Sequence, residues 1–562
     1  MREKFNVVIS TLNSKYIHSS LAPWCLFAGI GVFGIDEICA KVVEGTVNED
    51  IGGVAERIVK QSPNVVGLGC YIWNIEKIKQ LVKLIKSSLP DCIIVLGGPE
   101  VSYNAENVLK SNSEVDYIIS GEGELPFALL MNCLCKGDDV SKVPGLCYLN
   151  EGKALISKPY IHVKQPPSPY TEEYFAALNG RIAYLESSRG CPYSCAFCLS
   201  GRCGNARFFD IDRAEGEIIK LANSGAKTVK FVDRTFNANK NRADRIFKFI
   251  IDNYGENIPK GVCFHFEIAG DILDDGTISL LSTAPKGLIQ LEIGLQSFNE
   301  KTLKAINRKT NVEKLKSNIQ KLIENGNMHI HIDLIAGLPF EDMDSLKQSF
   351  NIAFKLNPNM LQFGFLKLLH GADMREKAEE YPCTYNPAPP YEVISTPWLS
   401  ADEIKGLHQF EDALERLYNS GRFRRTVNYL LQASGKLPFD LFYDFATKTQ
   451  INYNIPLDHY VTKVYEHFAA EPYVDKSVLR DEMVCDRLST NSSGVLPKVL
   501  QVEDKLLKKV KAYLTQQYPQ GEIKRSVAIL YSKDRAVYVD YDKKDPVTEE
   551  YALKLVDNCW LQ

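Results

Sequence analysis

The sequence lacks the segments that place a chain in or across a membrane. No stretch approaches about 18 consecutive apolar residues, which is the length that a membrane-spanning helix needs. The first 16 residues contain only one short apolar run, well below the roughly 7 to 15 apolar residues of a secretion signal. We therefore expect a cytoplasmic protein with no membrane partner.

A disulfide framework and a basic charge excess are also missing. The fifteen cysteines are scattered from Cys25 to Cys559 in a large chain, unlike the dense cysteines of small secreted domains. The net charge of −4 gives no general field for polyanions, so nucleic-acid binding is not indicated. The 562 residues, 45% of them hydrophobic and 24% charged, predict three or four globular domains.

Residues 1–137 alternate short β-rich runs with helical stretches. The segment 74–89 is one such helix, because its apolar residues recur at i, i+3, i+4 and i+7. This alternation predicts an α/β fold with a doubly wound parallel sheet, either flavodoxin-like or Rossmann-like. The G-x-G-x-x-G fingerprint is absent after the first strand, which disfavours a dinucleotide site. The predicted strands are 5–11, 38–45, 64–70, 92–98 and 115–120.

Three further segments follow. Residues 138–180 are rich in proline and polar residues and predict an extended linker. Residues 181–385 again alternate strands with helices, six strands in all, which predicts a partial (β/α)6 barrel. Residues 386–562 form a mostly helical extension, in which Ser400 and Glu403 suit an N-terminal capping box. Two strands over 525–542 predict a small sheet near the end of this extension.

Cys191, Cys195 and Cys198 are bunched at the C-terminal end of the first predicted barrel strand, where such barrels place their chemistry. A structural zinc site takes four ligands, and no second cysteine pair lies at a suitable distance. A cubane iron-sulfur cluster held by three thiolates would leave one iron open to a small molecule. At this point a zinc site and an electron-transfer cluster remain alternatives.

The spacing C-x3-C-x2-C, with Phe197 before the last cysteine, closely resembles the signature of radical S-adenosylmethionine (SAM) enzymes. The resemblance implies a 4Fe-4S cluster on the three cysteines, with the amino and carboxylate groups of SAM on the open iron. It also implies reductive cleavage of SAM to a 5'-deoxyadenosyl radical, with an external one-electron reductant such as a flavodoxin or a ferredoxin-like protein. The pattern needs no fourth ligand, and we expect Cys203 to be a packing residue.

Several later segments resemble the SAM-binding segments of that family. Alternation along the third barrel strand places Glu267 and His265 on one face, and we interpret His265 as an interior histidine. In the family, the G-L-P loop after the fifth strand cradles adenine. The resemblance thus implies SAM contacts from Phe197, Asp233, Arg234, Asn237, Glu267, Glu292, Gln296, Ser297, Asp333, Gly337, Leu338 and Pro339.

The loops at the carboxyl ends of the first sheet are rich in glycine, which permits close approach to a bulky ligand. A domain with these loops, followed by such a barrel, closely resembles the cobalamin-binding radical SAM enzymes of class B methylase-like architecture, in a branch with a C-terminal extension. The resemblance implies contacts to cobalamin from Cys70, Tyr71, Trp73, Asn74, Gly97, Gly98, Pro99, Glu100, Gly121, Glu122 and Gly123.

The cobalt-ligating motif D-x-H-x-x-G is missing, and His18 does not occupy that pattern. The implied binding mode leaves the lower face of the cobalt without a histidine, next to the loop that holds Tyr71 and Trp73. Trp73 suits a corrin contact and a core position equally well.

The resemblance implies a methylase acting on a small-molecule or nucleoside-type substrate, by hydrogen abstraction followed by methyl transfer from methylcobalamin. A radical lyase or rearrangement enzyme, such as a queuosine lyase that releases a modified base, is an alternative, and a non-catalytic iron-sulfur sensor or electron carrier is another. The extension is expected to recognise substrate. Its Arg422, Arg424 and Arg425 suit either an anion site or a solvated face.

Overall fold

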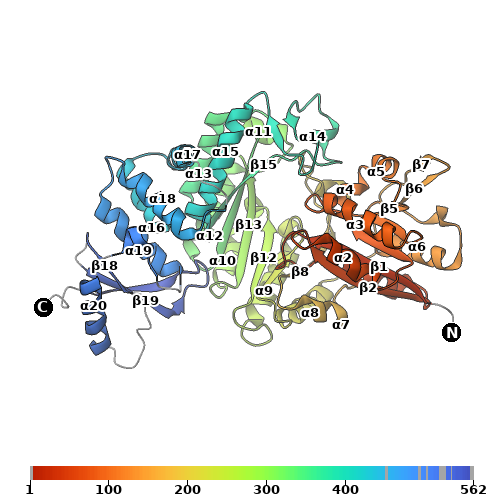
Figure 1. Cartoon of the computed structure of the whole chain (residues 1–562), viewed down its shortest axis with the longest axis horizontal. Helices are drawn as coiled ribbons and strands as arrows, with labels where there is room; N and C mark the ends of the chain where they lie inside the picture. Colours follow the sequence, from red (N-terminus) through yellow and green to blue (C-terminus); the bar gives the residue numbers. More distant parts are fainter. Residues whose placement is uncertain are drawn as a thin grey trace. The chain divides into compact units, whose positions relative to one another are not determined.

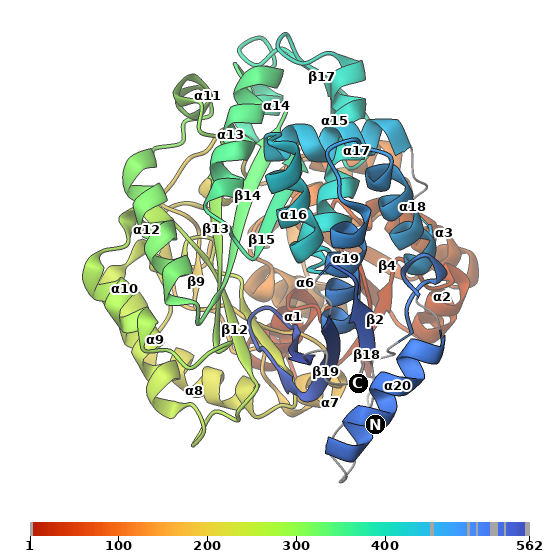
Figure 2. The same ribbon diagram turned by 90° about the vertical axis from the view of Figure 1, so that its left-hand side faces the viewer.

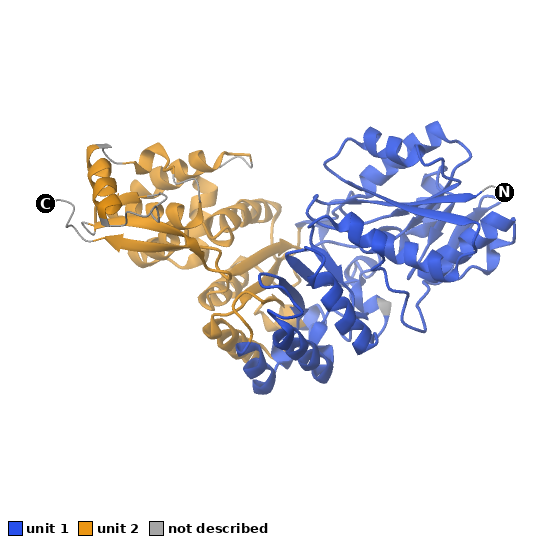
Figure 3. Cartoon of the chain, turned by 90° about the horizontal axis from the view of Figure 1, so that it is seen from below, with its two compact units in different colours: residues 1–283, 304–309, 366–394 blue, residues 284–303, 310–365, 395–562 orange. Residues whose placement is uncertain are grey.

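The computed structural model describes residues 4–449, 454–491, 495–501, 504–517, 527–532 and 535–556. The chain forms two compact units, coloured separately in Figure 3. Unit 1 comprises residues 1–283, 304–309 and 366–394, and unit 2 comprises residues 284–303, 310–365 and 395–562. Within the described ranges, no helix is long and apolar enough to cross a membrane.

The first sheet of unit 1 has seven strands in the order β2-β1-β3-β4-β5-β6-β7. Its strands β1, β2, β5, β6 and β7 are labelled in Figure 1. Strands β1 to β5 are parallel, and their order 2-1-3-4-5 is that of flavodoxin-like folds, as predicted. The seven strands are β1 (Phe5–Asn13), β2 (Ile38–Thr46), β3 (Val65–Gly69), β4 (Ile93–Gly97), β5 (Tyr117–Ile119), β6 (Leu146–Asn150) and β7 (Lys153–Leu155).

Strands β6 and β7 lie in the segment that the sequence predicts to be a linker. They are antiparallel and extend the sheet at its edge. Their hairpin turns at Glu151 and Gly152, which both have positive φ angles, 48° and 79°. This is the geometry of a type I′ turn, and a glutamate at its first central position hides it from sequence inspection.

Helices cover both faces of this sheet. One apolar core packs α1 and α6 through residues such as Ile30 and Phe127. The other core packs α2, α3 and α5 through residues such as Val54 and Ile78, and α3 confirms the helix predicted over 74–89. These helices are α1 (Ala22–Phe33), α2 (Ile51–Val59), α3 (Ile75–Ser88), α5 (Ala105–Ser111) and α6 (Glu124–Lys136).

The six predicted barrel strands are all present, and β8, β11 and β12, like β13, β14 and β15, pair in parallel. Unit 1 contains β8 (Ala183–Leu185), β11 (Thr228–Phe231) and β12 (Cys263–Ile268), and unit 2 contains β13 (Ile289–Gln296), β14 (His329–Ala336) and β15 (Met360–Phe365). The intervening helices are α8 (Ile211–Ala222), α9 (Lys240–Asn253), α10 (Asp275–Ser282), α12 (Val312–Asn325) and α13 (Met343–Lys355).

Each of these five helices starts with the same device. An aspartate or asparagine precedes the first turn, and its side chain accepts the free backbone N–H three residues later. Such caps fix where each helix starts, and therefore how long the loop after each strand is. The caps are Asp210, Asn239, Asp274, Asn311 and Asp342.

The C-terminal part of unit 2 is helical, and Ser400 and Glu403 form the predicted capping box of α15. Helix α20 packs on a three-stranded antiparallel sheet, visible together in Figure 2. The third strand of this sheet, β20, was not predicted, and residues 525–526 and 533–534 of the predicted pair lie outside the described residues. The elements are α15 (Ala401–Leu414), α16 (Arg424–Ser434), α17 (Pro438–Thr449), α18 (Leu457–Ala469), α19 (Lys476–Thr490), α20 (Asp504–Gln517), β18 (Val527–Leu530), β19 (Arg535–Lys544) and β20 (Tyr551–Val556).

Short elements complete the description. They are α4 (Pro99–Ser102), α7 (Glu172–Leu178), α11 (Glu300–Ala305), α14 (Asp373–Glu376), β9 (Ser188–Arg189), β10 (Arg207–Phe208), β16 (Thr384–Tyr385) and β17 (Val393–Ser395).

Candidate functional site

The three clustered cysteines lie in a loop of unit 1 that follows β9, and all three are partly exposed. Among the side chains that the structure describes, the three thiols do not form a group whose ligand atoms lie within 4.8 Å of one another. A tetrahedral zinc with Zn–S bonds of about 2.3 Å needs sulfur atoms about 3.8 Å apart. A 4Fe-4S cluster binds its cysteine ligands through several irons, so the expected cluster does not require this close spacing.

Hydrogen bonds clamp this loop at its centre. Ala196 N–H donates to Ile306 O at 2.9 Å, and Met374 N–H donates to Ala196 O at 3.0 Å. The amide of Asn307 donates to Ser194 O at 3.0 Å. At the start of the loop Gly190 has a φ of 87°, and a Cβ atom there would lie 2.6 Å from a backbone oxygen. The loop is thus preorganised by contacts from distant parts of the chain.

Each thiol has a neighbour that can stabilise negative charge on sulfur. Arg308 Nη1 donates to Cys195 Sγ at 3.7 Å, and the backbone N–H of Ser200 donates to Cys198 Sγ at 3.4 Å. The sulfur of Cys191 lies 3.3 Å from Thr235 Oγ1. Thiolates are the form that binds iron, so this donor set fits a cluster. Phe197 is half-buried within the loop, and the side chain of Cys203 lies outside the described residues.

Two residues that were expected to contact SAM, Asp233 and Asn237, form hydrogen bonds to other parts of the chain instead. The buried carboxylate of Asp233 accepts hydrogen bonds from Ser187 N–H at 2.9 Å and from the hydroxyls of Ser187 and Ser188 at 2.8 and 2.5 Å. Burial raises the pKa of Asp233 to about 6, although these hydrogen bonds oppose the shift. Asn237 exchanges two hydrogen bonds with the backbone of Ala269. Both side chains therefore position the ends of β8, β11 and β12.

Arg234, Glu267 and Lys230 form a partly exposed group of charges. The Arg234 side chain is 58% exposed, and Nη1 lies 3.9 Å from Glu267 Oε2. Lys230 Nζ lies at the same distance from the other carboxylate oxygen. These separations exceed hydrogen-bond length, and all three side chains line the pocket described next.

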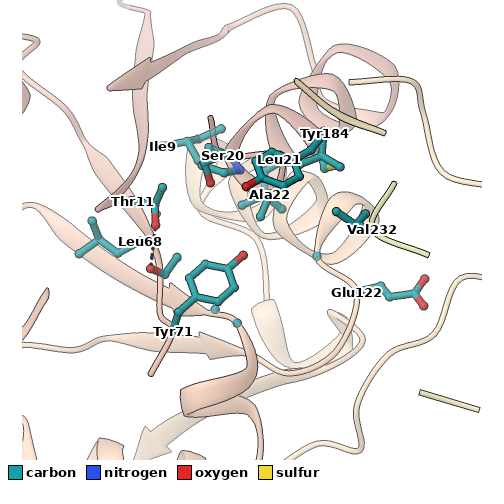
Figure 4. Close-up of a pocket in the computed structure, with 18 of the residues that line it drawn as sticks. Ile9, Thr11, Ser20, Leu21, Ala22, Leu68, Tyr71, Glu122, Tyr184 and Val232 are labelled. Carbon is teal, nitrogen blue, oxygen red and sulfur yellow. Dashed lines mark hydrogen bonds between the residues drawn. The ribbon is translucent and has the colours of Figure 1, made fainter. Parts of the chain in front are cut away.

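A pocket of about 620 Å³ in unit 1 lies at the carboxyl ends of β1, β3 and β4 (Figure 4). Its wall includes Thr11, Tyr71 and Glu122 from the first sheet and Tyr184 and Val232 from the barrel strands, all labelled in Figure 4. Parallel sheets bind ligands at this edge, and the volume is that of a small-molecule site.

The wall of this pocket fits the expected corrin. A Cβ atom at Gly97 would have only Ile119 O within 4 Å, at 3.7 Å, so the missing side chain leaves space beside the sheet. Gly98 has a φ of 104°, which favours glycine. The hydroxyl of Ser10, which also lines the pocket, is buried without a hydrogen-bond partner among the described residues. Gly121, Glu122 and Gly123, which are predicted to contact cobalamin, also line the pocket.

Tyr71 and Trp73 present an aromatic surface to this pocket. Their rings are stacked, with centroids 4.5 Å apart and planes 5° apart. Trp73 is 50% exposed and donates from Nε1 to Leu12 O at 3.2 Å, so it is not a core residue. His18 also lines the pocket, and its Nδ1 lies 2.7 Å from the hydroxyl of Tyr184.

Four predicted cobalamin contacts are absent from the lining of this pocket. Cys70 is fully buried, and Asn74 is buried with its amide donating to Gly69 O and Leu12 O. The carboxylate of Glu100 accepts a hydrogen bond from the hydroxyl of Tyr391. Pro99 lines a neighbouring pocket instead. Cys70, Asn74 and Glu100 therefore support the loops without lining the pocket. The polar groups of Asn74 and Glu100 already have hydrogen-bond partners, and Cys70 is not accessible.

The neighbouring pocket, of about 320 Å³, connects the first sheet with the cysteine loop. It shares Gly98, Glu122 and Arg234 with the larger pocket and reaches Gly190 and Ser200 on either side of the cysteines. Within unit 1, the two pockets thus form adjacent spaces from the glycine loops to the cysteine loop.

At this junction one arginine, Arg189, pairs with three carboxylates. Arg189 donates to Glu124 Oε1 at 2.5 Å and to Glu186 Oε2 at 2.8 Å, and it lies 3.3 Å from Glu122 Oε2. Burial alone would raise the pKa of Glu124, but the Arg189 charge and hydrogen bonds from His162 and Arg189 hold the pKa far below its usual range. Sequence analysis missed Arg189 and Glu186. Their position between β8 and the clustered cysteines could have indicated that these charged residues belong to the site.

In unit 2, Glu292, His331 and Asp333 come together on β13 and β14. One ligand atom from each lies within 4.8 Å of the others, and His331 Nε2 is 3.3 Å from Asp333 Oδ1. A register shift between Gly294 and Gln296 bends β13 at this level, where Gln296 has a φ of 72°. Two of the predicted residues, Glu292 and Asp333, thus share one polar region with His331.

Ser297 and the G-L-P loop are tied to a carboxyl that sequence analysis missed. Ser297 Oγ donates to Glu341 Oε1 at 2.6 Å, and Ser349 Oγ lies 3.2 Å from the same oxygen. Glu341 is fully buried, and burial raises its pKa to about 7 against these hydrogen bonds. Gly337 has a φ of 88°, and Leu338 and Pro339 after it are buried, so the loop offers backbone rather than side-chain groups.

Three family profiles match successive parts of the chain. Residues 38–131 match the B12 binding domain, residues 185–353 match the radical SAM superfamily, and residues 379–542 match a family described as a protein of unknown function (DUF4080). The first two profiles contain, respectively, the glycine loops of the pocket and the three clustered cysteines.

Two curated relatives are similar over most of the chain. The 2-(S-pantetheinyl)-carbapenam-3-carboxylate methyltransferase of Streptantibioticus cattleyicolor is 26% identical over 437 residues, which cover 68% of this chain and 60% of the relative. The cobalamin-dependent radical SAM methyltransferase TokK of Streptomyces tokunonensis is 27% identical over 432 residues, which cover 70% of this chain and 62% of the relative. The chain therefore spans about 60% of the length of these relatives.

A solved structure shares the fold over nearly the whole chain. The cobalamin-dependent SAM radical enzyme OxsB, determined with aqua-cobalamin and SAM bound, aligns with a TM-score of 0.58 and 15% identity. The alignment covers 92% of this chain and 81% of OxsB.

Proposed function

Because the chain carries a B12-binding domain followed by a radical SAM domain, and so belongs to the cobalamin-binding radical SAM proteins, we propose that it is a methyltransferase. It transfers a methyl group derived from SAM to a small-molecule or nucleoside-type substrate from which a hydrogen atom has been abstracted. The names of the two curated methyltransferases support this proposal. An external one-electron reductant, a flavodoxin or a ferredoxin-like protein, completes the system.

The observation that carries the proposal is the pair of adjacent pockets in unit 1. One is lined by the glycine loops of the first sheet, and the other reaches the cysteine loop, with Arg234 and Glu122 lining both. When bound, the cluster supplies the electron that cleaves SAM, and the corrin carries the methyl group. A sensor or electron carrier would need no second cofactor space next to its cluster.

The residues of the chain take distinct roles in this proposal. Cys191, Cys195 and Cys198 hold the cluster, and Arg308 compensates the negative charge of one thiolate. Arg234 and Glu267 have opposite charges and both line the larger pocket, which suits the carboxylate and the ammonium group of SAM.

In unit 2, the expected SAM contacts come from two groups of residues. The first is Glu292, Gln296 and Asp333 on β13 and β14, and the second is the loop Gly337–Pro339, whose backbone is proposed to contact adenine.

Anaerobic reconstitution with iron, sulfide and cobalamin tests the proposal. With SAM and a chemical reductant, we expect 5'-deoxyadenosine, together with S-adenosylhomocysteine whose formation requires added cobalamin. SAM with a deuterated methyl group should label a methylated product, whereas a lyase would fragment its substrate. Production of 5'-deoxyadenosine without cobalamin-dependent S-adenosylhomocysteine would refute methyl transfer and leave radical formation intact.

Two variants separate the two chemistries. Cys198→Ala should abolish 5'-deoxyadenosine and retain cobalamin binding. Gly97→Leu should fill the space beside β4 and abolish cobalamin binding, while the cluster spectrum and the far-UV circular dichroism remain unchanged. Loss of both cofactors in either variant would indicate a folding defect instead of a site effect.

A further inference from the structure

A separate pocket lies in the C-terminal extension, entirely within unit 2. Its volume is about 360 Å³, which is within the range of small-molecule sites. Residues from α18, α19, the loop before α16 and the segment 544–551 form its wall. None of the residues assigned above to the cluster, SAM or cobalamin lines this pocket.

The charge of the wall is strongly biased. Arg422, Arg487 and Lys544 are cationic, and Glu549 is the single carboxylate that lines the pocket, so the wall has a net charge of +2. Lys544 Nζ lies 3.5 Å from Glu549 Oε2, and the Lys544 side chain remains 46% exposed. Arg422 is also exposed. Two cations are therefore accessible to a ligand from solvent.

Arg487 provides the buried part of the site. Its side chain is nine-tenths buried, and Nη2 donates to Asp458 Oδ1 at 2.7 Å. Nε donates to Val495 O at 3.4 Å, but Nη1 has no hydrogen-bond acceptor in the described parts of the chain. A buried guanidinium N–H without an acceptor is unusual in folded proteins, and a bound anion would supply one.

The neighbouring Arg424 and Arg425 do not line this pocket and are bonded to the framework. Arg425 pairs with the buried Asp486 at 3.2 Å and with Glu550 at 2.8 Å. Arg424 donates to Asn359 O at 3.2 Å. These bonds connect the start of α16 with α19 and with the segment before β20, and so they fix the geometry of the pocket wall.

We propose that this pocket binds the phosphate monoester of a small molecule. A phosphate monoester carries a charge of about −1.5 to −2 at pH 7, which complements the net charge of the wall. A carboxylate would leave one cation uncompensated. The pocket also has an apolar side formed by Phe423, Val461 and Met483, which suits the organic part of an ester better than a free phosphate ion.

Isothermal titration of the full-length chain with phenyl phosphate tests this assignment, with phenyl sulfate as an isosteric ligand that stays monoanionic. At pH 7.5 we expect phenyl phosphate to bind about tenfold more tightly than phenyl sulfate. At pH 5.5 the difference should narrow to about threefold, because the second pKa of a phosphate monoester is about 6 and only about a quarter of it is still dianionic. Inorganic phosphate should bind more weakly than phenyl phosphate, because it leaves the apolar side empty.

The variant R422Q/K544Q keeps Arg487 and its partner Asp458 intact, and it should weaken phenyl phosphate at least tenfold. Lys463→Gln, an exposed lysine on the same helix α18 but outside the pocket, is the matched control and should leave the affinity unchanged. Equal affinity for phenyl phosphate and phenyl sulfate at pH 7.5 would overturn the proposal. Unchanged affinity in the double variant, or equally tight inorganic phosphate, would also overturn it.

Discussion

The substitution Glu341→Gln should stabilise the protein at neutral and alkaline pH. Burial raises the pKa of Glu341 from 4.5 to about 7, although Ser297 and Ser349 donate to its Oε1. Its other oxygen, Oε2, is buried without a hydrogen-bond partner in the described ranges. Glutamine has the shape of the protonated carboxyl group, so it can keep both serine hydrogen bonds without charge.

The expected size of this stability difference follows from the linkage between protonation of Glu341 and folding. Because the folded state holds the proton more tightly than the unfolded state, the contribution of Glu341 to stability is complete below pH 4.5 and is lost as the pH rises through about 7. The loss above pH 7 is about 3 kcal/mol, at 1.36 kcal/mol for each pH unit between the two pKa values. The variant should lack this loss.

Denaturant unfolding at pH 5 and pH 8 provides the assay. The ring centroids of Trp398 and Phe340, the residue before Glu341, lie 4.6 Å apart, so Trp398, one of four tryptophans, contributes a fluorescence signal from this region. We expect the stability difference between Glu341→Gln and the wild type to grow from pH 5 to pH 8. The exposed control Glu313→Gln on α12 should show no such trend. If Glu341→Gln is destabilised equally at both pH values, the buried carboxyl is not held in its neutral form and the reasoning is wrong.

Three further outcomes are expected. Cys203→Ala should retain the visible absorption of the cluster, because three cysteines suffice, and its loss would identify a fourth ligand. Arg308→Gln should lower the midpoint potential of the cluster by tens of millivolts in a spectroelectrochemical titration. The reason is that a cation beside Cys195 Sγ favours the more negative reduced state of the cluster. An unchanged potential would contradict this role of Arg308. Cobalamin should quench tryptophan fluorescence, and Trp73→Phe should remove a large part of that quenching, because Trp73 lines the pocket; undiminished quenching would place the corrin elsewhere.

Much of the architecture could be predicted from hydrophobic periodicity. The parallel strands β1 to β5 and the six barrel strands occur where alternating apolar runs predict them, and the capping box at Ser400 was recognisable from residue types alone. Strand β7 escaped because it has only three residues, and its turn has glutamate at a position with positive φ. Short edge strands depend on their neighbours in the sheet more than on their own sequence.

Residue types predicted the location of the site better than the role of each residue. Asp233 and Asn237 lie at strand ends, as expected, but hydrogen bonds to Ser187 and Ala269 occupy their polar atoms. Sequence position cannot show whether a polar side chain faces a ligand or a backbone group. Glu341 was missed for the related reason that its burial depends on packing between distant segments.

The ion pairs of Arg189 limit how this gene could be rearranged. The first sheet contributes Glu122 and Glu124, whereas their counter-ions Arg189 and Arg207 are encoded more than sixty codons downstream. A shortened gene that stopped before the barrel would express the sheet with Glu122 and Glu124 deprived of the cations that compensate their charges. Recombination that exchanged only the first sheet or only the barrel would therefore produce mismatched charges. A viable chimera has to carry both parts from the same parent.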